Sequence, residues 1–251
     1  MRLENEIRHV LLMTATITPD NAPQLARTDP IARLKDYEDA LTFYLTLIDR
    51  PLHGIVFVEN SDSDVTTLRK LVASRGLTDR VEFLCNYGVH RYSEMGRAHG
   101  EFKLLDHAMT ASRMVRDVEG AHVVWKITGR YIVKNLQSVI ARAPIEFDAY
   151  IDMKNHPMRW ADLRLMAWTA KGYDCIFRGI ADDLGAAIHE TVIRDYLPER
   201  AKGARVVQRF SREPYIYGIR GFDNRNYSEG RNLVKFYVRS VGRVLAPWYW
   251  I

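Results

Sequence analysis

Residues 126–131 (KITGRY) carry the cationic side chains best placed for chemistry. Lys126 and Arg130 flank the pair Thr128-Gly129, where glycine lets a ligand approach the backbone closely. A guanidinium can hold two phosphate oxygens at once. The spacing therefore predicts a phosphate site. The alternative is structural, with Lys126 solvated on a strand and Arg130 paired with a surface carboxylate.

Several familiar catalytic patterns are missing. The sequence has no G-x-x-x-x-G-K-[ST] loop and no G-x-G-x-x-G after its first apolar run, which disfavours NTPases and dehydrogenases, and it has no G-x-S-x-G elbow. His189-Glu190 begins like a zinc-protease motif, but Ile193 stands where the second histidine belongs. The histidines and cysteines show no metal spacing.

The composition is that of a globular protein. Of 251 residues, 47% are hydrophobic and 27% charged, which rules out disorder, collagen and coiled coil. Cys85 and Cys175 are far apart and cannot make a disulfide framework, so they fit a reducing compartment. The apolar run after residues 1–8 is too short for a signal peptide, and no stretch is long enough to span a membrane.

Positive charge is concentrated at the end of the chain. Residues 194–251 hold 12 Lys and Arg against 5 Asp and Glu, a net of +7, whereas the whole chain carries +5. That quarter is suited to a polyanion or an anionic membrane surface.

Apolar runs alternate with helical patterns in the first half. We expect strands at 9–17, 54–60, 81–86 and 122–127, and helices that start near 29–30, after 61–64 and after 96–101 and end near 48, 75 and 118. This order predicts a parallel sheet with helices on both faces. Ligands lie beyond the carboxyl ends of such strands, here at residues 14–18, 59–62, 86–88 and 128–131.

The second half is less regular. We expect strands at 147–153, 163–168 and 205–210, a helix at 182–197, a loop at 218–227 and a closing helix at 229–245. The expected fold class is therefore α/β, with a mostly parallel sheet flanked by helices and a basic C-terminal helical extension.

Four segments in this order carry a family resemblance: TATITP (14–19), FVENSDSD (57–64), GRAHGE (96–101) and WKITGRY (125–131). They resemble small bacterial glycosyltransferases of surface-polysaccharide (O-antigen and capsule) gene clusters, whose pattern reads T-A-T-x-x-P, F-V-E-N-S-G, G-x-G-x-G-E and K-x-T-G-R-Y. The resemblance is strongest from residue 10 to 135. Asp62 and Ala98 stand where the pattern has glycine, a departure that bears on loop conformation.

The resemblance implies a GT-A-like, Rossmann-type fold that binds a nucleotide sugar. Such enzymes usually end the fourth strand in Asp-x-Asp, which holds a divalent metal on the diphosphate, but here that place reads Thr128-Gly129-Arg130. The leaving nucleoside diphosphate gains negative charge in the transition state, which Arg130, helped by Lys126 or Lys103, can stabilise. We therefore expect a metal-independent transferase without a cofactor. Were a metal used, Asp152 would be its expected ligand.

Donor contacts are expected where the first two strands end and where the helix after 96–101 begins. Glu59 and Asn60 can bond ribose or base, or cap the next helix. Thr14 and Thr16 can contact the base, or simply pack. The expected donor residues are Thr14, Thr16, Glu59, Asn60, Lys103, Lys126, Thr128, Gly129 and Arg130.

An inverting transfer needs a carboxylate base within reach of the acceptor hydroxyl. Asp152 and Glu190 are the first candidates, ahead of Asp162. Asp152 lies between Ile151 and Met153, an apolar setting that can raise the pKa of a carboxylate. Each of the three can instead be a surface or capping carboxylate.

The closing helix has a basic and an apolar side. Its cations recur every four residues at Arg231, Lys235, Arg239 and Arg243, and PWYWI follows at 247–251. This is typical of a peripheral membrane anchor; the alternative is a helix packed on the core with a charged outer face. A lipid-linked acceptor would suit such docking, and its diphosphate can use Arg220, Arg225 or Arg231.

We therefore expect a cytoplasmic glycosyltransferase, peripheral on the anionic inner membrane, that transfers a sugar from a nucleotide-diphosphate donor to a lipid-linked or growing surface polysaccharide. Residues 1–135 are expected as the nucleotide-sugar-binding half, 136–228 as the acceptor-side half of the same domain, and 229–251 as the basic amphipathic helix and aromatic tail. The alternatives are a sugar-phosphate nucleotidyltransferase and a non-catalytic nucleic-acid-binding protein. The first usually has a Gly-rich loop after its first strand, and the second lacks a recognition motif here, so no nucleic-acid partner is expected.

Overall fold

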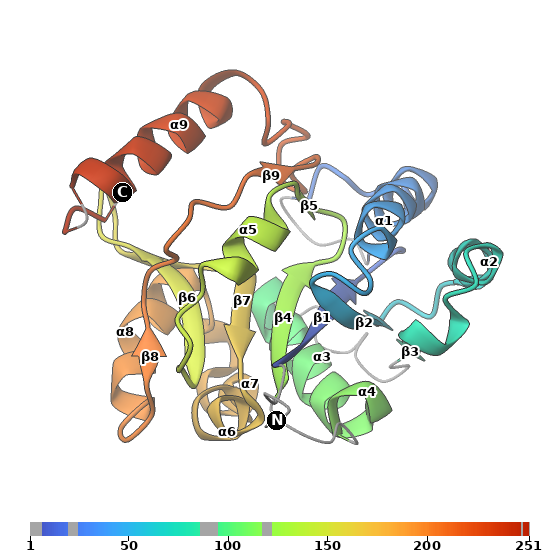
Figure 1. Cartoon of the computed structure of the whole chain (residues 1–251), viewed down its shortest axis with the longest axis horizontal. Coiled ribbons are helices and arrows are strands. Elements are labelled where there is room, and N and C mark those ends of the chain that lie inside the picture. Colours follow the sequence, from blue (N-terminus) through green and yellow to red (C-terminus); the bar gives the residue numbers. More distant parts are fainter. Residues whose placement is uncertain (1–6, 20–24, 86–94, 117–121, 247, 251) are drawn as a thin grey trace, which may run out of the picture.

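The computed structural model describes residues 7–19, 25–85, 95–116, 122–246 and 248–250. At its centre is a seven-stranded sheet (Figure 1), in the order β3-β2-β1-β4-β7-β6-β8. Its strands are β1 (Arg8–Ala15), β2 (Leu52–Glu59), β3 (Val81–Cys85), β4 (His122–Thr128), β6 (Ala149–Lys154), β7 (Trp160–Trp168) and β8 (Val206–Val207).

The sheet is mostly parallel. β1 pairs in parallel with β2 and β4, and β2 with β3. β7 runs antiparallel to β4 and β6, while β8 is parallel to β6. The carboxyl ends of β1, β2, β4 and β6 and the amino end of β7 therefore meet at one edge, where open α/β sheets bind their ligands.

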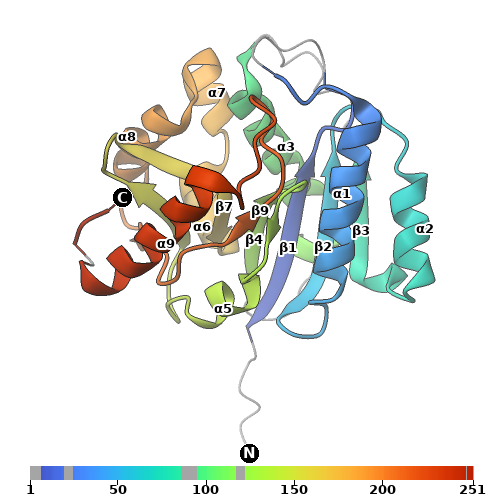
Figure 2. The ribbon, with the colours of Figure 1, turned by 90° about the horizontal axis from the view of Figure 1, so that it is seen from above.

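Helices cover both faces of the sheet (Figure 2). One face packs on α1 (Pro30–Leu45), α2 (Thr66–Ser74) and α5 (Leu136–Ala141), and the other on α3 (Arg97–Ala111), α4 (Arg113–Arg116), a π-helix (Tyr173–Phe177), α7 (Ile180–Leu184) and α8 (Glu190–Arg200). Successive strand residues point to opposite faces, so Leu11 and Met13 join the first core and Val10 and Leu12 the second.

Short elements complete the fold. They are the 3-10 turns η1 (Thr78–Arg80) and η4 (Gly185–Ala187), the short helix α6 (Ala170–Gly172), and the two-stranded antiparallel sheet of β5 (Ile132–Val133) and β9 (Ile216–Tyr217). The closing helix α9 (Gly230–Leu245) lies over the β6–β7 side of the molecule (Figure 1). None of the described helices is long and apolar enough to cross a membrane.

The expected fold class is confirmed, and the first four expected strands correspond to β1–β4. The helix expected at 182–197 is wrong in its middle, because α7 ends at Leu184 and Gly185 turns the chain with φ +50° before α8 begins. The strand expected at 205–210 shortens to β8. Residues 86–88, expected at the site, lie outside the described residues.

Candidate active site

A cavity of about 650 Å³ opens at the carboxyl edge of the sheet, between the strand ends, the starts of α3 and α8, and the inner face of α9. This volume suits a small-molecule ligand. The expected site residues that line it are Thr14, Thr16, Asn60, Thr128, Arg130, Asp162, Glu190, Arg220, Lys235 and Arg239. Those that do not line it are Glu59, Lys103, Lys126, Gly129, Asp152, Arg225, Arg231 and Arg243.

Hydroxyl and amide groups form the wall where β1 and β2 end. Thr16 Oγ1 donates to Asn60 Oδ1 at 2.7 Å, and Thr14 Oγ1 donates to Glu101 Oε1 at 3.0 Å. The Thr16 amide donates to the hydroxyl of Tyr37 at 2.9 Å. These groups lie on the cavity surface, where hydroxyls and amides can hydrogen-bond a nucleoside.

Glu59 ends β2 but turns away from the cavity. It is 1% exposed, and its carboxylate accepts hydrogen bonds from the backbone amides of Ile17 at 3.1 Å, Ser61 at 2.9 Å and Ser63 at 3.3 Å. It therefore ties the turns after β1 and β2 together. The expected contact with the nucleoside is corrected to this structural role.

Lys126 is fully buried inside β4. Its Nζ lies 2.6 Å from Glu101 Oε1 and donates to the Leu163 carbonyl. The solvated alternative is therefore wrong, and the side chain does not reach the cavity to meet a phosphate. Because β4 is a central strand with α3 packed against it, the ammonium instead neutralises Glu101 at the cavity wall.

Arg130 lines the cavity beyond the end of β4 and is 9% exposed. Its Nη1 donates to the Ile219 carbonyl at 2.6 Å and its Nη2 to the Tyr131 hydroxyl at 2.8 Å. No carboxylate among the described residues lies within ion-pair distance of it. The alternative of a surface ion pair is therefore wrong, and the guanidinium charge is available to an anionic ligand.

Gly129 serves the sheet rather than a ligand. Its amide donates to the Thr14 carbonyl at 2.8 Å, and a Cβ at this position would lie 2.8 Å from that same oxygen. Only glycine allows the chain to pass β1 so closely. The close approach expected of a ligand is thus made by β1.

The loop at 218–227 packs directly on Arg130. A Cβ at Gly221 would lie 2.6 Å from Arg130 Nη2, so glycine leaves the space that the guanidinium fills. The Gly221 carbonyl also accepts hydrogen bonds from the amides of Ala26 at 2.8 Å and Arg27 at 2.9 Å. The loop therefore closes one side of the cavity.

Three of the expected cations lie outside the cavity. Lys103 forms an ion pair with Asp182 of α7. The Arg225 side chain is 76% exposed and lies 3.7 Å from Asp223, and Arg231 is exposed at the start of α9. The expected contacts of Lys103 with the donor diphosphate, and of Arg225 and Arg231 with an acceptor diphosphate, do not fit this placement.

Three arginines of the cavity wall, Arg33, Arg97 and Arg164, were missed in the sequence. Arg33 of α1 is 5% exposed and donates through Nε to the Thr16 carbonyl at 2.8 Å. Arg164 of β7 donates through Nε to Asp162 Oδ1 at 2.8 Å. Arg33 precedes the buried Tyr37 by one helical turn, and Arg164 shares a strand face with Asp162, which are the signals that could have identified them.

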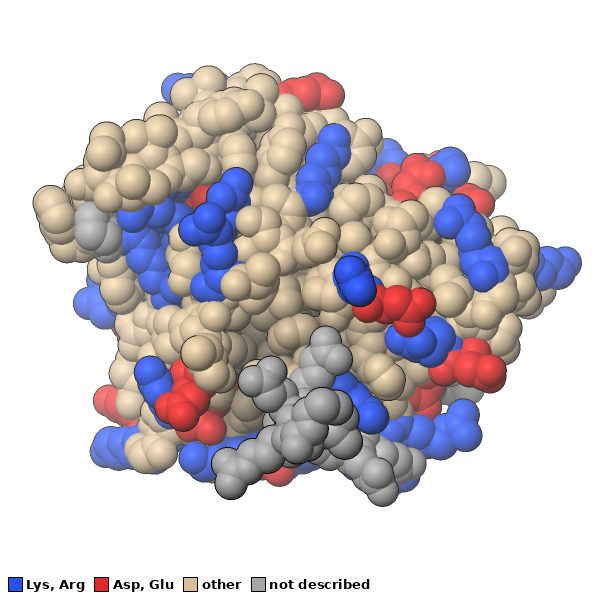
Figure 3. Space-filling model, viewed as in Figure 1, with Lys and Arg blue, Asp and Glu red and all other residues tan. Residues whose placement is uncertain are grey.

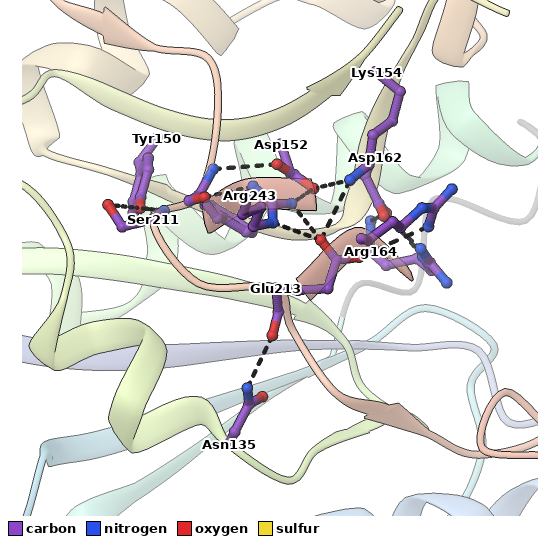
Figure 4. A network of polar contacts seen from close by, with 11 residues as sticks. Asn135, Tyr150, Asp152, Lys154, Asp162, Arg164, Ser211, Glu213 and Arg243 are labelled. Atoms are coloured by element: carbon purple, nitrogen blue, oxygen red, sulfur yellow. Dashed lines mark hydrogen bonds and ion pairs between the residues drawn. The ribbon is translucent and has the colours of Figure 1, made fainter. Parts of the chain in front are cut away.

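Asp152 lies outside the cavity in a buried cluster of charges (Figure 4). Its Oδ2 is 2.6 Å from both Lys154 Nζ and Arg243 Nη2. Glu213 completes the cluster, with Oε2 2.7 Å from Arg243 Nε and 3.5 Å from Lys154 Nζ. Two carboxylates and two cations thus join β6, the segment before β9, and α9.

The ionisation of Asp152 differs from expectation. Burial alone raises the pKa of this carboxyl, but the charges of Lys154 and Arg243 outweigh burial and bring the pKa to about 2. The expected rise is therefore wrong, because the apolar neighbours in sequence are not its neighbours in space. A carboxylate with so low a pKa, paired with two cations outside the cavity, is too weakly basic and too far from the ligand to suit a general base. Arg243, with 5% of its side chain exposed, is likewise withdrawn from any membrane surface.

This pKa predicts acid sensitivity. The carboxyl of Asp152 has its usual pKa of 3.8 in the unfolded chain and a pKa of about 2 in the folded protein. Its contribution to the free energy of unfolding is therefore complete above about pH 4 and is lost as the pH falls through about 2. We expect a loss of about 2 kcal/mol in the free energy of unfolding over this interval. Urea unfolding at several pH values measures it. Asp152→Asn should flatten that part of the curve, and equal slopes for both proteins would contradict the assignment.

Glu190 is one of two candidate bases that line the cavity. It is exposed at the first position of α8, beside His189, which caps the helix. Asp162 also lines the cavity, but although burial alone raises its pKa, Arg164 outweighs burial and lowers it. Asp162 is therefore held ionised in an ion pair.

The cavity is positively charged. Of the residues that the structure describes, seven cationic side chains line it against four acidic ones: Arg33, Arg97, Arg130, Arg164, Arg220, Lys235 and Arg239 against Glu101, Asp162, Glu190 and Glu213. In Figure 3, Lys and Arg atoms gather beneath the edge formed by α9. Among the described residues, no three His, Cys, Asp or Glu side chains are arranged to hold a metal ion. A cation-rich cavity at this sheet edge suits an anionic ligand.

Several solved structures align with most of this chain. The inositol-1-phosphate CTP transferase of T. maritima aligns over 96% of this chain and 98% of its own with a TM-score of 0.52 and 10% identity. A candidate nucleotide-diphospho-sugar transferase of Desulfovibrio desulfuricans G20 aligns over 80% and 79% (TM-score 0.46, 14% identity), and the galactosyltransferase LgtC, in complex with donor and acceptor sugar analogues, over 78% and 64% (0.42, 7%).

No protein-family model matches the sequence, and no curated protein does so either. At 10% identity the CTP transferase shows the fold alone. It confirms the expected GT-A-like α/β architecture.

Proposed function

We propose that this protein is a glycosyltransferase that uses a nucleotide-diphosphate sugar. The observation that carries the proposal is the cation-rich cavity at the carboxyl edge of a GT-A-like sheet, with hydroxyl and amide groups on one wall and Arg130 and Arg164 on another. The first wall suits a nucleoside and the second a diphosphate. The resemblance of KITGRY and its companion segments to bacterial glycosyltransferases points the same way.

Charge stabilisation is the main task of such a site. As the bond from the sugar to the diphosphate breaks, negative charge develops on the leaving oxygen, and preorganised cations lower the barrier. Arg130 is held by Ile219 and Tyr131 before any ligand arrives, so little reorganisation is needed. We also propose that the guanidinium groups of Arg130 and Arg164 stabilise this charge without a metal ion.

Glu190 is our proposed base. Its carboxylate would accept the proton of the acceptor hydroxyl as that oxygen attacks the anomeric carbon of the donor. We expect Glu190→Gln to lower kcat by about 10²–10⁴ and to leave donor affinity unchanged. Glu199→Gln, an exposed position on the same helix outside the cavity, is the matched control. A variant at Glu190 with the kcat of the control would exclude this role.

The finer assignment follows from the resemblance. We propose a bacterial surface polysaccharide, lipid-linked or growing, as the acceptor and the cytoplasmic side of the inner membrane as the place of action. The nucleic-acid alternative is less suited to this arrangement, because Arg239 lines the cavity and Arg243 is buried, so that these two arginines do not form an outer binding surface.

A nucleotidyltransferase is the second candidate, favoured by the alignment with the CTP transferase over nearly the whole of both chains. The two reactions use different substrates. A glycosyltransferase releases a nucleoside diphosphate from a nucleotide sugar, whereas a nucleotidyltransferase releases pyrophosphate from a nucleoside triphosphate and a sugar phosphate. Measuring which product forms separates them.

The direct test is a thermal-shift screen of UDP, GDP, CDP and their nucleosides, with Mn²⁺ or with EDTA. A ligand at 100 times its Kd adds about 2.7 kcal/mol to the stability of the folded state. We expect one diphosphate to raise the melting temperature equally in Mn²⁺ and EDTA, and its nucleoside to do so less. Protection that appears only with Mn²⁺ would overturn the proposal that the transfer is metal-independent. If no nucleotide protects the protein, the whole proposed function is overturned.

A further inference from the structure

α9 turns its apolar side outward. The exposed fractions are 60% for Val234, 52% for Val238, 54% for Val241, 78% for Val244, 72% for Leu245 and, just beyond the helix, 78% for Trp248. In Figure 3 the edge at α9 is correspondingly free of charged atoms over much of its length. Surface helices normally bury this side, and a contiguous exposed apolar patch marks an interaction site.

The second half of the basic side of α9 faces the protein, while Arg231 and Lys235 stay exposed. Lys235 and Arg239 line the cavity, and Arg239 Nη1 lies 3.8 Å from Glu213 Oε1. Arg243 is locked into the buried cluster with Asp152 and Glu213 (Figure 4). Turning the cations outward would leave two buried carboxylates short of partners, so the orientation of the helix is fixed.

The chain beyond α9 keeps this orientation. The Trp250 carbonyl accepts hydrogen bonds from the amides of Asn155 at 2.8 Å and His156 at 3.0 Å. The ring of Tyr249 stacks on His156 with centroids 4.4 Å apart. The C-terminal end of the apolar face is thus attached to the body, and the face itself is exposed.

We propose that α9 is a two-sided binding element for a lipid that carries the acceptor. Its outer apolar face lies in a lipid surface, and its inner cations Lys235 and Arg239 hold the phosphate or diphosphate head group of the lipid in the cavity. The first part stands on the helix alone, and the second rests on the proposed function.

An amphiphile is the occupant that meets both sides. A helix with its side chains is about 10–12 Å across, so the cavity cations and the apolar face lie within the length of one lipid head group and the start of its chain. Charge complementarity assigns an anion to the inside of α9 and an apolar chain to the outside. Trp248 at the end of the face suits the boundary between head groups and hydrocarbon.

The first part of the proposal, that the apolar face lies in a lipid surface (the lipid arm), makes a distinctive prediction. The basic face expected from the sequence would give salt-sensitive binding to anionic lipid, whereas an apolar outer face gives binding to neutral phosphatidylcholine vesicles that survives about 0.5 M salt. We expect Val241→Glu/Leu245→Glu to weaken vesicle co-sedimentation at least about tenfold. Ile145→Glu, which changes an 89% exposed apolar side chain elsewhere, is the matched control and should bind as wild type.

Three results would overturn the lipid arm. One is no sedimentation with any vesicle, and another is binding that requires anionic lipid and disappears at high salt. The third is a dimer in light scattering that Val241→Glu/Leu245→Glu converts to monomer, which would assign the face to a second copy of this chain.

The second part of the proposal, that Lys235 and Arg239 hold the head group (the head-group arm), is tested by comparing vesicles doped with a polyprenyl diphosphate against the same vesicles doped with the polyprenol. We expect tighter binding to the diphosphate, and we expect Lys235→Gln/Arg239→Gln to remove that difference while keeping binding to undoped vesicles. Equal binding to both vesicles would overturn this arm. Because neither assay uses a nucleotide, vesicle binding without any nucleotide protection would reject the proposed function and leave the lipid surface standing.

Discussion

Arg130→Ala should lower kcat by about 10²–10³, the effect of removing one preorganised group that stabilises charge in the transition state. It should also weaken binding of the nucleoside diphosphate, because Arg130 lines the cavity without a carboxylate partner among the described residues. Steady-state kinetics and diphosphate titration measure the two effects. Arg75→Ala, an exposed arginine after α2, is the control and should match wild type in both.

The variant also removes a hydrogen bond that holds the loop at 218–227, since Arg130 donates to the Ile219 carbonyl. The affinity for the nucleoside without phosphates separates the two roles. If the guanidinium binds the diphosphate, the variant loses affinity for the nucleoside diphosphate and keeps its affinity for the nucleoside. A purely structural guanidinium would lose both by the same factor, and unchanged kcat and diphosphate affinity would remove the basis of the proposed mechanism.

The edge of the sheet could be predicted from the sequence because its signals are local. Uninterrupted apolar runs bounded by turn residues identify buried parallel strands, and the residues just past such strands face a common crevice. Thr16, Asn60 and Thr128 therefore line the cavity as expected. The position of each residue at a strand end was enough to predict that it lies at this edge.

The partners of buried charges could not be predicted in this way. Lys126 reads as a phosphate ligand or a solvated strand residue until α3 brings Glu101 to within 2.6 Å of it. Glu59 likewise appears beside a nucleoside site in the sequence, but backbone amides from two turns take up its oxygens. Side-chain direction at a strand end is set by such distant groups.

The direction of α9 is the largest difference from expectation. Helical periodicity shows that the cations and the apolar residues lie on opposite sides, but it does not say which side faces the body. Asp152 and Glu213, from β6 and the segment before β9, decide this by pairing with Arg243. The same pairing argues against Asp152 as the base, because the charge that fixes the helix also lowers the basicity of the carboxylate.

Arg243→Met should lower the free energy of unfolding by about 3–5 kcal/mol, the usual cost of removing one partner from a buried ion pair. The loss arises because Asp152 and Glu213 then keep Lys154 as their only fully buried cation among the described residues, with Arg239 at 3.8 Å from Glu213. Chemical denaturation measures it. Arg231→Met, an exposed arginine on the same helix, is the control, with an expected change within about 0.5 kcal/mol.

Charge balance, rather than lost packing, is the cause we assign, and a double variant tests it. Arg243→Met with Glu213→Gln restores neutrality to the cluster, because one carboxylate and one ammonium remain, and it should be more stable than the sum of the single effects predicts by about 0.5–3 kcal/mol. Strictly additive losses would contradict a shared charge network and assign the effect of Arg243 to its contacts alone. A less-than-additive loss would mean that the inward turn of the α9 cations is maintained by the two carboxylates beneath the helix.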